Sequence, residues 1–61
     1  SLQVLKNGLI EVRRQFNGRE LVGLFNTSNQ TVTIDGNGQE VLSQNYEGRQ
    51  LTQDGFLIYR K

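Results

Sequence analysis

The fold is decided by residues 20–34, ELVGLFNTSNQTVTI. The run LVGLF at 21–25 places apolar residues on both faces of an extended strand, which is typical of a strand in the middle of a sheet. Small polar residues follow from Asn26, and TVTI at 31–34 then alternates polar and apolar residues, as a half-buried strand does. We therefore predict a central strand over 20–26, a corner over 26–30 and a second strand over 30–35.

Asn-Gly pairs punctuate the chain, at residues 7–8, 17–18 and 37–38. Asn-Gly is the preferred pair for a two-residue type I′ hairpin turn, because both positions need a positive φ. The remaining strands are expected over 2–5, 9–16, 40–43, 50–52 and 56–59, with a loop over 44–49 and a turn at 53–55. This pattern predicts a single all-β domain over residues 1–61, a small antiparallel β-sandwich or meander of roughly six to seven short strands.

The composition excludes several kinds of chemistry. The chain has no Cys and no His, which removes disulfides, thiolate metal sites and the commonest general base. Its net charge is +1 and its charges are scattered along the sequence, whereas a nucleic-acid-binding domain shows a basic stripe. No apolar run approaches the ~18 residues of a membrane span. We expect no metal, no cofactor, no nucleic acid and no membrane partner, and the lack of Cys favours the cytoplasm.

No set of residues in the sequence forms a catalytic motif. The acidic residues fall in predicted turns or on predicted solvent faces of strands, and no serine is accompanied by a base. We therefore expect that the chain is not itself an enzyme. Its small core without disulfides and its lack of an initiator Met indicate a fragment of a larger protein.

Arg14 interrupts the apolar face of the predicted strand 9–16. An Arg in that position either binds a docking partner or extends to solvent at the rim of the sheet. Three aromatic residues, Phe16, Tyr46 and Tyr59, are candidates for a sugar-stacking platform, although such rings are more often packed in a core.

The order of these segments resembles a known domain. IEVRR at 10–14, LVGLFNTSNQTVTI at 21–34, VLS at 41–43 and LTQDGFLIY at 51–59 resemble the C-terminal β-domain of α-amylase-type glycoside hydrolases of family 13. The sequence departs from the family at residues 53–54, Gln-Asp, where the family often has Pro and an aromatic residue.

The resemblance implies a non-catalytic accessory domain that packs on and stabilises a catalytic (β/α)₈ barrel of an enzyme acting on α-glucans. It carries over Arg14, Asn26 and the closing strand 56–59 as structural positions, with Arg14 and Asn26 as candidate docking residues. Two other functions stay open. One is a free-standing carbohydrate-binding module that binds α-glucan, and the other is a small SH3-like or OB-like interaction domain.

Overall fold

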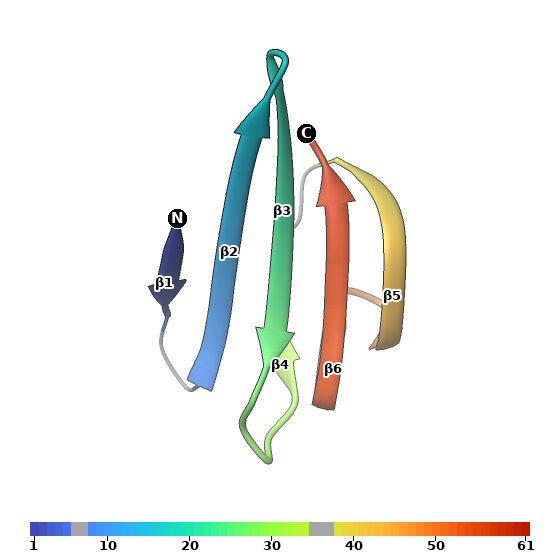
Figure 1. Ribbon diagram of the computed structural model, residues 1–61. Coiled ribbons are helices and arrows are strands. Elements are labelled where there is room, and N and C mark those ends of the chain that lie inside the picture. Colours follow the sequence, from blue (N-terminus) through green and yellow to red (C-terminus); the bar gives the residue numbers. More distant parts are fainter. Residues whose placement is uncertain (6–7, 35–37) are drawn as a thin grey trace.

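The computed structural model describes residues 1–5, 8–34 and 38–61. The strands are β1 (Leu2–Val4), β2 (Leu9–Phe16), β3 (Arg19–Asn26), β4 (Val32–Thr33), β5 (Gln39–Glu47) and β6 (Gln50–Arg60). All pair antiparallel in one sheet that curls into a half-barrel (Figure 1), and the described residues contain no α-helix. The predicted all-β class is confirmed. The second sheet that a sandwich requires is not present among the described residues.

Strand β6 organises the sheet. The strand order is β1-β2-β3-β6-β4, and β5 pairs with β6 on its other edge. One edge of β6 therefore pairs with β3 along residues 56–60 and with β4 at residues 50–51. The predicted central position of the third strand is also confirmed, because β3 pairs with β2 along its whole length and with β6 on the other side.

The β2–β3 hairpin closes at the Asn17-Gly18 pair, where φ is 53° and 72°. Both values are positive, as a type I′ turn requires, so this predicted turn is confirmed. The other two predicted Asn-Gly turns include Asn7 and Asn37, which lie outside the described residues. A further two-residue turn joins β5 to β6 at Gly48 and Arg49, with φ of 56° and 66°.

Two predicted irregular segments are wrong. The loop expected over 44–49 is mostly strand, because β5 continues to Glu47. The turn expected at 53–55 lies inside β6. The chain accommodates its turn-forming residues as a bulge: Asn45 and Asp54 have φ of 55° and 62°, and the register between β5 and β6 shifts beside them. The Asn45 side chain donates to the Gln53 carbonyl at 3.2 Å across the bulge.

The fourth strand is shorter than predicted. Only Val32–Thr33 pairs as strand β4, opposite Leu51 and Gln50 of β6. The Ile34 amide then bonds to the Arg49 carbonyl at 2.8 Å, and Asp35 lies outside the described residues.

The hydrophobic core lies on one face of the sheet, which we call the inner face. It consists of seven buried side chains: Leu9, Val22, Leu24, Ile34, Leu51, Leu57 and Tyr59. Residues directly opposite each other in an antiparallel pair share a face, so the register places the alternate residues of β2, β3 and β6 on the opposite, outer face. No segment of the described chain covers that outer face.

Candidate functional site

The outer face is apolar over most of its area. Each row of the sheet contributes apolar residues to it: Leu2 beside Val12, Val4 beside Ile10, Leu42 beside Ile58, and Phe25 beside Phe56. Many of them are open to solvent, with exposed fractions of 68% for Leu2, 56% for Leu42 and 43% for Leu21. Contiguous exposed apolar surface of this kind marks a site where a soluble domain contacts something else.

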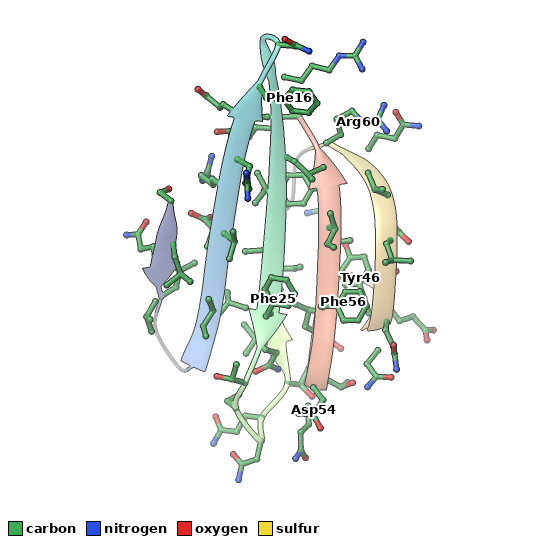
Figure 2. All side chains as sticks on the ribbon, in the orientation of Figure 1. Phe16, Phe25, Tyr46, Asp54, Phe56 and Arg60 are labelled. Carbon is green, nitrogen blue, oxygen red and sulfur yellow. The ribbon has the colours of Figure 1, made fainter. Side chains whose placement is uncertain are left out.

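A hollow lies at the centre of the outer face, where Gly23 has no side chain. It measures about 160 Å³ and its lining is almost wholly apolar, from Val12, Leu21, Phe25 and Ile58 together with Arg14. The Phe25 ring lies over the glycine, at a distance of only 3.0 Å from the point where a Cβ of residue 23 would be. The centroid of the Phe25 ring lies 6.1 Å from the centroid of the Phe56 ring on β6. Figure 2 shows these two side chains on neighbouring strands. The glycine thus creates a shallow socket with an aromatic border.

Arg14 lies on the same face as Ile10 and Val12, as the alternation of β2 predicts, and the structure makes this the outer face. Its cross-strand partner is Leu21, its side chain is exposed, and it makes no ion pair or hydrogen bond within the described ranges. Phe16, at the end of the same strand, is 74% exposed. Figure 2 shows Phe16 and Arg60 at the same end of the sheet, next to the β2–β3 hairpin.

Asn26 lies on the inner face, so the structure does not bring it together with Arg14. Its side chain is 2% exposed. The Asn26 Nδ2 donates to the carbonyls of Gln30, Leu51 and Thr52, at 2.7, 2.9 and 3.2 Å. Its Oδ1 accepts from the Ser28 amide and hydroxyl, at 3.0 and 2.7 Å. These bonds fasten the corner after β3 to the start of β6, as the predicted role in the corner implies.

The three aromatic candidates for sugar stacking lie apart. Tyr59 is a core residue with 6% exposure, and Tyr46 packs against the same core from β5. Phe16 extends from the hairpin end of the outer face. Burial raises the pKa of the Tyr59 phenol above its ordinary value of 10.0. The structure therefore does not assemble these rings into one platform.

The inner face carries an ion cluster beside the core, contrary to the prediction that every acidic residue lies on a solvent face or in a turn. Arg13 Nε lies 2.9 Å from Glu11 Oε1, and Arg13 Nη1 lies 3.1 Å from Glu20 Oε1. Lys61 Nζ lies 3.6 Å from the same Glu20 oxygen. The Glu11 and Glu20 side chains are only 14% and 19% exposed. Ile10 and Val12 face outward, and the alternation of β2 therefore places Glu11 and Arg13 on the inner face.

This cluster is unsuited to acid–base catalysis. The hydrogen bond from Arg13 lowers the pKa of Glu11 below its ordinary value of 4.5, whereas a general acid needs a raised pKa. Within the described ranges no group of three or more His, Cys, Asp or Glu side chains is placed to hold a metal ion. The same ranges contain no helix long and apolar enough to span a bilayer.

The fold and this surface define an all-β domain, one curled antiparallel sheet with its outer face uncovered. Comparison of the chain with protein-family models, with curated proteins and with solved structures found no match. The sequence did not predict the Gly23 hollow. It also did not predict that two further arginines, Arg19 and Arg60, lie at the same end of the outer face as Arg14. The apolar–glycine–apolar order LVGLF was the available signal for the hollow, because a glycine in a central strand marks close approach of another group.

Proposed function

We propose that this chain is a non-catalytic β-domain that docks through its outer face on a larger partner domain. The observation that carries the proposal is the uncovered apolar outer face around Gly23. Stable domains bury each apolar sheet face against a second layer of secondary structure. Here the chain covers only the inner face with its own residues, so the partner supplies the second layer for the outer one.

The resemblance to the C-terminal β-domain of α-amylase-family glycoside hydrolases suggests which partner this is. In that arrangement the second layer belongs to the catalytic (β/α)₈ barrel, whose outer ring consists of helices. Helices pack well on the face of a twisted sheet. The chain would then stabilise the barrel of an enzyme acting on α-glucans, without contributing a catalytic residue.

The size of the sheet agrees with a stable interface. The two longer dimensions of the chain are 35 Å and 21 Å. A face of those dimensions is close to the roughly 800 Å² that one partner buries in a standard-size interface. The half-buried Ile58 lies beside Gly23 near its middle, where interface residues contribute most to affinity.

The experiment pairs the chain with catalytic barrels of α-amylase-family enzymes from which the C-terminal β-domain has been removed. We expect the chain to bind and to raise the melting temperature of a compatible barrel. Ile58→Ser should abolish both effects, because it places a hydroxyl in the centre of the outer face. Val41→Ser is the matched control, since Val41 is 48% exposed but lies in the β5 bulge.

Two outcomes would contradict the proposal. One is a panel of barrels none of which gains stability from the chain. The other is a rise in the melting temperature of a barrel that Ile58→Ser and Val41→Ser reduce equally. That result would show that the stabilisation does not depend on the outer face. Calorimetry with maltooligosaccharides tests the carbohydrate-binding alternative, because a carbohydrate-binding module releases or absorbs heat without any barrel.

A further inference from the structure

Three arginines from three different strands meet at the hairpin end of the outer face. Arg14 on β2 and Arg60 on β6 are the two cross-strand partners of Leu21, and Arg19 is the partner of Phe16. All three arginine side chains are exposed, and the described part of the chain offers none of them an ion pair or hydrogen bond. We call this group, Arg14, Arg19 and Arg60, the arginine rim.

A cleft opens beside Arg19 and Arg60 of the arginine rim. It has a volume of about 240 Å³ and is lined by Phe16, Arg19, Leu21, Arg60 and Glu20. The floor is apolar, and two of the walls are guanidinium-bearing side chains. Glu20 closes the cleft from the inner side.

That carboxylate is already bound elsewhere. Glu20 Oε1 lies 3.1 Å from Arg13 and 3.6 Å from Lys61, both on the inner side of the sheet. The positive charge of the arginine rim therefore has no internal counter-charge among the described residues. Guanidinium groups beside an apolar floor favour a ligand that combines a carboxylate with an aliphatic side chain.

We infer that the arginine rim recognises carboxylates of the partner domain, and that the occupant of the outer face is a helix with an aliphatic stripe and acidic residues at one end. This inference rests on the proposed function and adds the chemistry of the partner. The aliphatic stripe enters the Gly23 hollow and lies against Phe25. The acidic residues pair with the arginine rim and fix the direction in which the helix lies.

The spacing of the outer face sets the spacing on the helix. Leu21, beside the arginine rim, precedes Phe25 by four positions along β3. Four residues of strand span about 13 Å, which corresponds to roughly nine residues of α-helix. A complementary helix therefore carries its acidic residues two to three turns from the aliphatic residue that meets Phe25.

Other occupants fit the surface less well. A second copy of the chain would offer the arginine rim no carboxylate from β1, β2 or β3, because the register places no Asp or Glu of these strands on the outer face. Nucleic acid needs polar and cationic contacts along its whole length, whereas the cations here are confined to one end of an apolar surface. An anionic lipid surface would complement both the apolar area and the cations of the outer face. It has no fixed distance between its charged and apolar groups, so it does not select the spacing described above.

The test uses a fluorescent helical peptide of about eighteen residues, roughly 27 Å long, which fits within the 35 Å longer dimension of the chain. Leucines form its stripe and glutamates occupy one end. A second peptide carries lysines in place of the glutamates, and a third keeps the composition but moves the glutamates to the middle of the stripe. Vesicles of phosphatidylglycerol and a single-stranded oligothymidylate complete the set of probes.

We expect the first peptide to bind most tightly, with an affinity that falls as salt increases. Arg14→Gln and Arg60→Gln should each weaken binding about threefold, and together about tenfold, because partly exposed ion pairs contribute modestly and nearly additively. Lys61→Gln removes one cation on the inner side and should leave binding unchanged. Circular dichroism of each variant verifies that the fold is retained.

Equal binding of the glutamate and lysine peptides would overturn the inference while leaving an apolar docking surface, and hence the proposed function, intact. Preferential binding of the vesicles or of the oligothymidylate would overturn it in favour of those partners. A dimer that Phe25→Ser dissociates would overturn it in favour of a second copy. Failure of every barrel to bind, with the glutamate peptide still selected, would contradict the proposed function alone.

Discussion

Replacing Asn26 with Ala should destabilise the domain more than any other single polar substitution that the structure suggests. The Asn26 side chain accepts two hydrogen bonds from Ser28 and donates three to backbone carbonyls. The acceptor at Leu51 is fully buried, so Ala removes a hydrogen bond that solvent does not replace. The substitution also detaches the corner 27–30 from the first residues of β6.

The magnitude follows from these bonds. A hydrogen bond of this kind contributes about 1 kcal/mol net, and a buried group left unsatisfied costs about 1–3 kcal/mol. The two shortest carbonyl bonds and the pair to Ser28 together give a loss of about 3 kcal/mol in the free energy of unfolding. A domain of this length is typically stable by about 3–9 kcal/mol, so Asn26→Ala should leave it close to unfolding.

Urea denaturation followed by far-ultraviolet circular dichroism measures this loss, as a lower midpoint with an unchanged slope. Thr27→Ala is the matched control, because the Thr27 hydroxyl makes a single exposed bond to the Gly8 carbonyl at 2.6 Å and its loss should cost at most about 1 kcal/mol. Asn26→Asp keeps the shape but places a carboxylate against three carbonyls, so it should cost more at neutral than at acidic pH, relative to the parent chain at each pH. If Asn26→Ala costs less than about 1 kcal/mol, or no more than Thr27→Ala, the bonds do not fasten the corner to β6.

Further substitutions test three features: the assignment of faces, the bulge and the ion cluster. Leu51→Ala should cost about 2–5 kcal/mol because Leu51 is fully buried, whereas Leu21→Ala on the outer face should cost under about 1 kcal/mol; similar urea midpoints would contradict the assignment of faces. Gly55→Ala places a Cβ 2.8 Å from two backbone carbonyls in the bulge and should cost about 1–3 kcal/mol. Gly48→Ala, which has open space but a φ of 56°, should cost only about 1 kcal/mol of backbone strain. Because the pKa of Glu11 is lowered on folding, its stabilisation is present above pH 4.5 and is lost as the pH falls through the folded-state pKa. Thermal melts in acid should therefore show a smaller loss for Glu11→Gln than for the parent chain, and identical losses would remove the ion pair as a cause.

The sequence determined the local elements where a short-range rule governs the backbone. Asn17-Gly18 specified its hairpin because both residues adopt a positive φ at little cost, and the flanking strand 9–16 was predicted to the residue. LVGLF specified a central strand because both of its faces are apolar. The same local rules failed at Asp54-Gly55, where a turn signal is satisfied by a bulge inside β6.

The candidate site was predicted only in part. Alternation along β2 placed Arg14 on the apolar face, and that position is confirmed. Alternation could not say which face of β2 turns inward, because that depends on what packs against the sheet. It therefore placed Glu11 in solvent, whereas the structure holds it against Arg13 beside the core.

Only the tertiary structure decided how the charges are grouped. In sequence Arg14, Arg19 and Arg60 are scattered, and a chain with scattered charges has no evident binding site. Pairing β3 with β2 on one side and with β6 on the other places all three at one end of the outer face. The physical reason is that strand register, which long-range packing sets, joins residues that no local pattern connects.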